Sequence, residues 1–190
     1  MIIGEHSVIR TGEPDDAYAL MRLYDPGRPH SFLLGPHREV VVPTADELRE
    51  VLARRDIVTG SFFVVDDKEG EVRGCAVMRA ARIESEFAEV IVGLADDAEY
   101  GTPLADEALS YIRYLTLVEK KLNKIVANCL LTEQPYRDLL VRNGFQSDGV
   151  QRQIMYTLGR YHDLETLSLF RAGGPAAPEG ETHEPAPTAT

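Results

Sequence analysis

A strand, a short turn and a helix follow one another in the middle of this chain, and their order constrains the fold more than any other stretch. The apolar run Val90–Leu94 predicts a buried strand. Thr102 and Pro103 favour the N-cap and first position of a helix, and apolar side chains recur at helical spacing from Leu104 onward. The first N–H groups of a helix have no internal partner, so such a turn is a potential anion site.

Composition is that of an ordinary globular protein: 190 residues, 44% of them hydrophobic and 27% charged. No apolar run approaches the roughly 20 residues that span a bilayer, and the start lacks a basic region followed by an apolar segment. We therefore expect a cytoplasmic protein that does not insert in membranes. Cys75 and Cys129 lie in apolar runs and are expected to be reduced core thiols. The five histidines are too scattered to predict a metal site.

The formal net charge is −11. This argues against nucleic acid as the main partner, because neutralising phosphates requires clustered Lys and Arg. It is compatible with a cationic substrate such as a polyamine, an aminoglycoside or a basic peptide N-terminus. Acidity that merely keeps the protein in solution explains it equally well.

The remaining patterns predict short helices and strands around that central stretch. Thr44 and Glu47 form a capping box that opens a helix, and Gly144 stands where a left-handed residue ends another. Residues 30–42 fit no regular element. Residues 172–190 lack bulky apolar side chains and predict a disordered acidic tail after a domain spanning 1–171. Strands are predicted at 7–10, 61–65, 71–80, 86–94, 125–131, 150–158 and 164–170. Helices are predicted to begin at Pro14, at Thr44 and at Thr102, and the third of these runs to Glu119. A fourth helix is predicted at 136–142.

Four motifs in this order resemble the GNAT superfamily of acyl-CoA-dependent N-acyltransferases. The closest likeness is to the branch that acetylates ribosomal-protein N-termini, which spermidine acetyltransferases also resemble. The resemblance covers residues 7–170 and implies an α+β fold with a mixed, mostly antiparallel central sheet flanked by helices. The motifs are Phe32–Pro36, Tyr100-Gly101 with Leu104–Leu109, Leu139–Phe145 and Gly159–Asp163.

In that family acyl-CoA lies in a V-shaped opening between two strands that separate. Its pantetheine arm pairs with the end of the first strand, and its pyrophosphate contacts N–H groups of the following turn. A family Asn that often contacts the arm corresponds to Glu133 here. The resemblance therefore implies acetyl-CoA-binding roles for Val92, Gly93, Leu94, Tyr100, Gly101, Thr102, Leu104, Ala105 and Glu133.

The turn departs from the family pattern Arg/Gln-x-x-Gly-x-Gly/Ala at two positions. Tyr100 replaces the Arg or Gln, and Pro103 replaces the central Gly. Proline has no N–H to offer a phosphate oxygen, and its ring occupies space that Gly leaves open. We therefore expect weaker binding of acetyl-CoA. Five carboxylates nearby add negative potential: Asp96, Asp97, Glu99, Asp106 and Glu107.

Acyl transfer to an amine needs a group that removes a proton from the amine. Carboxylates that open the central strand, Glu84, Glu86 and Glu89, are candidates, and we favour Glu89 because it directly precedes the buried run. Exposed strand-edge glutamates are the plainer interpretation. Tyr136 is the candidate acid, although a packing tyrosine fits its position as well. His162 is better explained by a hairpin turn than by a proton relay.

Two functions follow from these observations. The first is an acetyl-CoA-dependent N-acetyltransferase that acts by direct transfer on a primary amine of a peptide N-terminus, a polyamine or another small cationic molecule. The second is a catalytically inactive GNAT-like protein that serves as a binding or regulatory module. A catalyst must bind acetyl-CoA at the turn around Pro103, whereas a binding module need not. A monomer and a homodimer are both compatible with the sequence.

Overall fold

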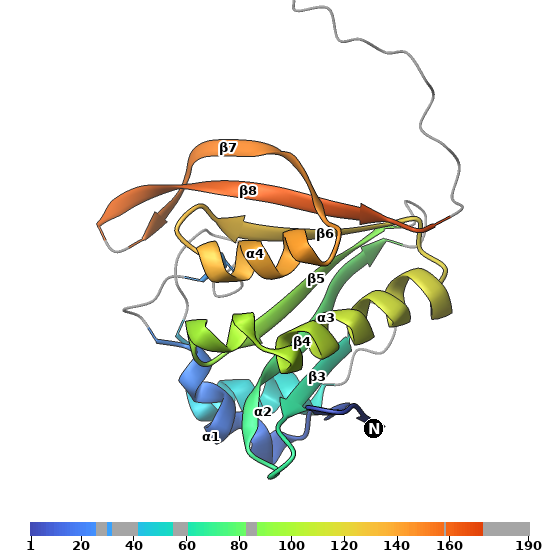
Figure 1. Ribbon diagram of the computed structural model, residues 1–190. Coiled ribbons are helices and arrows are strands. Elements are labelled where there is room, and N and C mark those ends of the chain that lie inside the picture. Colours follow the sequence, from blue (N-terminus) through green and yellow to red (C-terminus); the bar gives the residue numbers. More distant parts are fainter. Residues whose placement is uncertain (26–29, 32–41, 55–60, 83–86, 158, 173–190) are drawn as a thin grey trace, which may run out of the picture.

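An eight-stranded sheet forms the centre of the computed structural model (Figure 1). Its strand order is β1-β2-β3-β4-β5-β6-β8-β7, and all neighbours are antiparallel except the parallel pair β5 and β6. The structure describes residues 1–25, 30–31, 42–54, 61–82, 87–157 and 159–172, with the backbone alone for 80–82. The strands are β1 (Ile2–Ile3), β2 (Val8–Thr11), β3 (Ser61–Asp66), β4 (Val72–Arg82), β5 (Phe87–Leu94), β6 (Lys124–Leu130), β7 (Gln146–Thr157) and β8 (Arg160–Phe170).

Helices cover both faces of the sheet. Helices α3 and α4 pack on one face, and α1 and α2 pack on the other (Figure 1). This architecture confirms the predicted α+β fold with a mostly antiparallel sheet. The helical segments are η1 (Pro14–Asp16), α1 (Ala17–Leu20), η2 (Met21–Leu23), α2 (Ala45–Ala53), η5 (Asp97–Gly101), α3 (Pro103–Arg113), the π-helix η6 (Tyr114–Glu119) and α4 (Gln134–Arg142).

Local sequence signals place most of these elements correctly. The Thr44 hydroxyl accepts a hydrogen bond from the Glu47 N–H at 3.2 Å, and the Glu47 carboxylate accepts one from the Thr44 N–H at 2.7 Å, which confirms the capping box. Gly144 has φ of 89°, as a left-handed residue after α4 requires. The motif at 32–36 and nearly all of the predicted tail lie outside the described residues.

Two predictions about the central helix are wrong in detail. Thr102 occupies the N-cap position, but its hydroxyl donates to the carbonyl of Glu99 at 2.7 Å and does not cap α3. The helix also changes after Arg113 into the π-helix η6, where the Thr116 hydroxyl donates to the carbonyl of Ile112 at 2.7 Å. A side chain that bonds back to the preceding turn competes with the regular backbone ladder, and such residues often bend helices.

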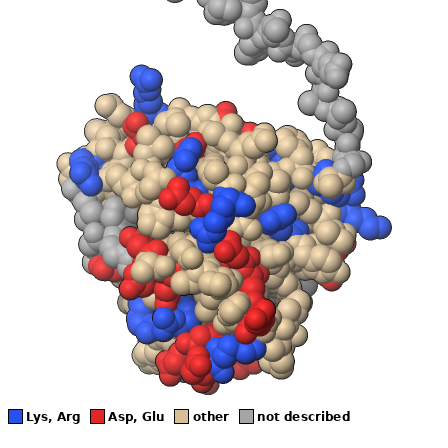
Figure 2. All heavy atoms as spheres, in the orientation of Figure 1, with Lys and Arg blue, Asp and Glu red and all other residues tan. Residues whose placement is uncertain are grey.

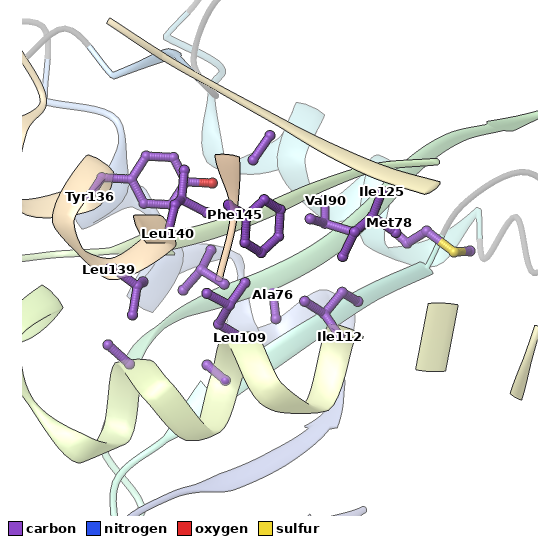
Figure 3. Close-up of a cluster of buried hydrophobic side chains, with 14 of the residues drawn as sticks. Ala76, Met78, Val90, Leu109, Ile112, Ile125, Tyr136, Leu139, Leu140 and Phe145 are labelled. Carbon is purple, nitrogen blue, oxygen red and sulfur yellow. The ribbon is translucent and has the colours of Figure 1, made fainter. Parts of the chain in front are cut away.

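The main core lies between the sheet and the pair α3 and α4 (Figure 3). Alternate residues of β5, among them Val90, point into it and meet Leu109 and Ile112 of α3 and Leu140 of α4. Side chains alternate between the faces of a strand, so the residue that precedes Val90, Glu89, points to the opposite face. The two faces of β5 therefore differ in chemistry.

Strands β5 and β6 run side by side for only part of their length. Their parallel pairing covers three residue pairs and ends at Glu89 and Val126. Beyond that point β5 pairs with β4 alone, and β6 pairs with β8 alone. The facing edges of Val90–Leu94 and Ala127–Leu130 consequently separate, and we call the region between them the β5–β6 opening.

Candidate active site

The β5 edge of the opening is closed by Tyr100, which is 1% exposed. Its hydroxyl accepts a hydrogen bond from the Leu94 N–H at 3.1 Å and donates one to the Val92 carbonyl at 3.3 Å. Burial raises the pKa of this phenol, so the hydroxyl keeps the proton that it donates. The resemblance assigned this end of the strand, Val92–Leu94, to the pantetheine arm. In this conformation Tyr100 takes that place.

The β6 edge is closed by Glu133, a buried residue just before α4. Its Oε2 accepts a hydrogen bond from the Leu130 N–H at 2.6 Å, and its Oε1 accepts one from the Ser31 N–H at 3.0 Å. The ring Nδ1 of His30 lies 3.0 Å from the same Oε1. Ser31 in turn donates from its hydroxyl to the Asn128 carbonyl at 2.7 Å. Glu133, predicted to contact acetyl-CoA, therefore ties residues 30–31 to the end of β6.

Tyr136 reaches the same opening from α4 (Figure 3). It is 2% exposed, and its ring centroid lies 5.4 Å from that of Tyr100. Burial raises its pKa well above the usual range. The Tyr136 hydroxyl makes no hydrogen bond of standard geometry with the residues that the structure describes, although the backbone of Val92 lies close enough to lower its pKa slightly against the effect of burial. A buried polar group without a partner costs free energy, so this hydroxyl is a natural contact for a polar atom of a ligand.

The turn before α3 offers few donors to an anion. Pro103 has no N–H, and the N–H groups of Ala105 and Asp106 donate to the Thr102 carbonyl at 3.1 and 3.4 Å. Within the described residues, the Leu104 N–H is the one donor of the first helical turn that makes no such bond. Thr102 itself donates its N–H to the Glu99 carbonyl at 3.0 Å.

Cations around this turn are already engaged by its carboxylates. Asp106 accepts hydrogen bonds from Arg142 Nε at 3.0 Å and from Asn143 Nδ2 at 2.6 Å. Arg142 also donates to the Tyr100 carbonyl, and Arg73 pairs with Glu99. A phosphate at this turn would therefore compete with fixed internal carboxylates.

Glu89 lies at the point where β5 and β6 part, on the face opposite the main core. It is half-buried, and Asn128 Nδ2 donates to its Oε1 at 3.0 Å. The Thr166 hydroxyl donates to Asn128 Oδ1 at 2.8 Å, which orients the amide so that its NH₂ group faces Glu89. Glu89 is therefore not a fully exposed residue at a strand edge, which was the alternative interpretation of the sequence. The other two candidates, Glu84 and Glu86, lie outside the described residues.

Asn128 and Thr166 were not predicted as site residues. Both belong to strands that were predicted, and they are register partners in β6 and β8. Only the pairing of these strands with β5 brings them to Glu89. No local pattern in the sequence signals such a contact.

The other groups considered in the sequence, His162 and the two cysteines, are buried within the fold. His162 is buried in the β7–β8 hairpin with Nε2 at 3.3 Å from the Thr157 carbonyl, as the turn interpretation predicted. Cys75 and Cys129 are buried free thiols, and burial raises the pKa of each to about 12. No helix in the described part of the chain is long and apolar enough to cross a membrane.

The same arrangement of strands and helices occurs in known acetyltransferases. A structure described as a probable acetyltransferase superposes with a TM-score of 0.72 at 24% identity, covering 88% of this chain and 94% of the other. The spermidine N-acetyltransferase of Vibrio cholerae in complex with CoA and spermine gives a TM-score of 0.74 at 18% identity, covering 88% and 97%. The chain has the GNAT acetyltransferase fold. No protein-family model and no curated protein matches the sequence.

The β5–β6 opening offers polar groups that suit the arm of an acyl-CoA, on one condition. The β5 edge presents the backbone groups of Val92 and Leu94, and the buried Tyr136 hydroxyl makes no hydrogen bond of standard geometry within the described structure. These features suit an extended arm with amide groups and a reactive end. The Tyr100 hydroxyl must first release the two backbone groups, because each is already hydrogen-bonded.

Proposed function

We propose that this protein is an N-acetyltransferase that uses acetyl-CoA as co-substrate and acts on a primary amine of a small cationic molecule or peptide. One observation carries the proposal: the β5–β6 opening has the Glu89 carboxylate on one face and the Tyr136 hydroxyl on the other. An amine and a thioester that enter from opposite faces would meet between the strands. The structural similarity to acetyltransferases supports the same reaction.

In this proposal Glu89 removes a proton from the amine. Its carboxylate is held in place by Asn128, which Thr166 orients. A fixed carboxylate at this position would also attract the protonated form of the amine before transfer. A polyamine is the acceptor that we favour, because the net charge of −11 attracts cations and one structural relative was solved with spermine.

On the other face, acetyl-CoA supplies the thioester carbonyl that the amine attacks. Backbone groups of Val92, Gly93 and Leu94 would hold its arm once Tyr100 releases them. The Leu104 N–H, with Gly101 beside it, would face the pyrophosphate. The hydroxyl of Tyr136, which burial keeps protonated, would donate a hydrogen bond to the departing sulfur and supply its proton, although the raised pKa makes the phenol a weak acid for this step.

The test measures release of the CoA thiol from acetyl-CoA in the presence of spermidine or a short basic peptide. Glu89→Gln keeps the acceptor oxygen for Asn128 but removes the base, and we expect kcat to fall by roughly 10²–10⁴. Glu119→Gln, at an exposed residue of η6, is the matched control and should leave kcat unchanged. Equal activity of Glu89→Gln and the unmodified protein would remove Glu89 from this role.

Binding of acetyl-CoA is measured separately by thermal unfolding. A hundredfold excess over the dissociation constant corresponds to about 2.7 kcal/mol of stabilisation. Absence of a shift at millimolar acetyl-CoA, together with no thiol release, would overturn the enzyme proposal. The catalytically inactive binding protein would then be the better description, with Pro103 and the hydrogen bonds of Tyr100 as its physical basis.

A further inference from the structure

A second site lies at the other end of α3, away from the opening. A cavity of about 640 Å³ is bounded by the end of α3, the π-helix η6 and the end of β8. This volume is within the range of small-molecule sites, roughly 300–1,000 Å³. Among the described residues its lining includes three cationic side chains, Arg113, Lys121 and Arg171, and no Asp or Glu.

The fold brings these cations together from distant parts of the chain. Arg113 is the last residue of α3, and the wide turn of η6 leads from it towards Lys121. Lys121 has φ of 57°, a left-handed conformation in which the chain turns towards β6. Arg171 directly follows β8, and its N–H donates to the Asn123 carbonyl at 2.8 Å. All three side chains therefore line one cavity.

None of the three cations has a carboxylate partner in the described part of the chain. The Nε atoms of Arg113 and Arg171 are buried without a hydrogen-bond acceptor there, and Arg113 Nη1 has only a 3.5 Å contact with Asn143 Oδ1. By contrast, the nearby Lys124 pairs with Asp148 at 2.7 Å. Buried guanidinium donors without acceptors are costly. A bound anion would satisfy them.

The surface of the molecule shows the same separation of charge. In Figure 2 blue side chains lie at the right, near the end of α3 and the end of β8, with little red beside them, whereas elsewhere in the view blue and red are mixed. Red side chains are concentrated nearer the middle and bottom of the same view. An anion approaching this region consequently meets positive charge although the whole chain is strongly acidic.

The walls of the cavity add an apolar and aromatic component. Tyr114 and Phe170 line it and are 50% and 58% exposed, and Leu117 and Leu169 lie between the strand and the helix. The Lys124 ammonium lies 5.0 Å from the centre of the Phe170 ring. Exposed rings beside cations suit a ligand that has both a planar body and an anionic group.

We infer that this cavity binds a small organic anion that carries a phosphate or carboxylate group on a planar ring. Arg113 and Arg171 hold the anionic group with their guanidinium donors, and Lys121 adds a third positive charge. The ring lies against Tyr114 and Phe170. The site is separate from the turn before α3, because α3 has 11 residues and spans about 16 Å between the two ends.

Titration calorimetry of the full chain with phenyl phosphate, benzoate, inorganic phosphate and phenol tests the inference. Phenyl phosphate and benzoate should bind measurably, inorganic phosphate at least about threefold more weakly than phenyl phosphate, and phenol not at all. A difference between phenyl phosphate and benzoate identifies which anionic group is preferred. Binding of phenol as tightly as phenyl phosphate, or binding of none of the anions, would overturn the inference.

Variants locate the binding. Arg171→Gln and Lys121→Asn should each weaken binding of phenyl phosphate at least about threefold, and the combination with Arg113→Gln at least about tenfold. Asn is chosen at 121 because it tolerates a left-handed backbone, which keeps one variant informative if the triple variant fails to fold. Lys120→Gln removes an exposed cation that does not line the cavity and should have no effect. Equal losses in Lys120→Gln and Lys121→Asn would mean diffuse charge attraction and no site.

A competition experiment with CoA tests whether the anion binds at the cavity or in the β5–β6 opening. Saturating CoA should leave the affinity for phenyl phosphate unchanged, since the two sites lie at opposite ends of α3. Competition between them would place the anion in the opening and contradict the inference. Failure of the acetyltransferase assay has no bearing on this result, because binding at the cavity requires neither Glu89 nor acetyl-CoA.

Discussion

The two ends of α3 differ in how favourably their side chains would interact with a bound anion. At its N-terminal end the helix dipole favours an anion, yet Pro103 lacks an N–H and Asp106 already holds Arg142. At its C-terminal end the dipole disfavours an anion, yet Arg113 and its two cationic neighbours have no carboxylate partner in the described structure. The dipole is worth about 0.3–1 kcal/mol, whereas a charge-assisted hydrogen bond contributes about 1.5–3 kcal/mol. Side chains therefore outweigh the helix in setting where an anion binds.

The N-terminal end also has a second obstacle that the C-terminal end lacks. Tyr100 is attached to this turn and occupies backbone groups of β5, so the proposed acetyl-CoA would have to displace an internal contact as well as overcome repulsion. The cavity at the C-terminal end needs no such displacement. The contrast can be tested by changing each end separately.

The largest effect is expected from reversing a charge at the C-terminal end. Arg113→Glu removes a guanidinium donor and adds repulsion, so the affinity for phenyl phosphate should fall by roughly 10- to 100-fold. Calorimetry with phenyl phosphate and with CoA on the same sample measures both ends at once. An equal loss of CoA affinity would show that the two ends are not independent.

The next largest effect concerns the two buried tyrosines at the opening. Tyr100→Phe leaves the Leu94 N–H and the Val92 carbonyl without a partner, so the free energy of unfolding should fall by about 1–3 kcal/mol. Tyr136→Phe removes a hydroxyl that makes no hydrogen bond of standard geometry with the described residues, so it should lower the free energy of unfolding by less than about 1 kcal/mol. Urea unfolding measures both variants.

Binding of CoA by Tyr100→Phe shows whether the Tyr100 hydroxyl obstructs the co-substrate or supports it. Tyr100→Phe should strengthen binding of CoA several-fold in calorimetry, because the arm no longer competes with the hydroxyl. Weaker binding in this variant would mean that Tyr100 supports the co-substrate and does not obstruct it.

A change in the turn should have a smaller effect on the N-terminal end. Pro103→Gly restores an N–H and removes the ring, so CoA should bind up to about tenfold more tightly, as expected for one added charge-assisted hydrogen bond. Pro103→Ala restores the N–H but keeps a side chain, and the difference between the two variants measures the effect of space. Unchanged affinity in both would refute this explanation of the turn. Affinity for phenyl phosphate should stay constant.

The smallest effect is expected from the first-turn carboxylate. Asp106→Asn removes one negative charge and loosens the hold on Arg142, so CoA should bind about two- to threefold more tightly at low salt. Raising the ionic strength should abolish this difference, because the group is partly exposed and its charge is screened. A difference that persists at high salt would point to a change in shape instead of charge.

Local patterns predicted the elements that position the opening. Alternating and continuous apolar runs identified β3 to β5, the capping box identified α2, and Pro103 marked the first residue of α3. Each of these signals depends on residues within one or two turns of each other. The resemblance to GNAT proteins added the expectation that β5 and β6 separate, which the register confirms at Glu89 and Val126.

Contacts across the chain escaped prediction. The sequence showed Tyr100 as a changed turn residue, but its role in closing β5 depends on the path of η5. His30 and Glu133 are 103 residues apart and meet only because α4 packs at the end of β6. The cavity at Arg113 and Arg171 likewise requires η6 and β8 to end side by side.

The sequence by itself determined where strands, turns and helices begin, because caps, prolines and hydrophobic periodicity act over a few residues. Only the tertiary structure decided which of their polar groups are free. Tyr100, Glu133 and Asp106 are held by hydrogen bonds within the fold, whereas the Nε atoms of Arg113 and Arg171 are buried without an acceptor in the part of the chain that is described. Long-range packing sets that division, since it alone determines which buried donors meet an acceptor.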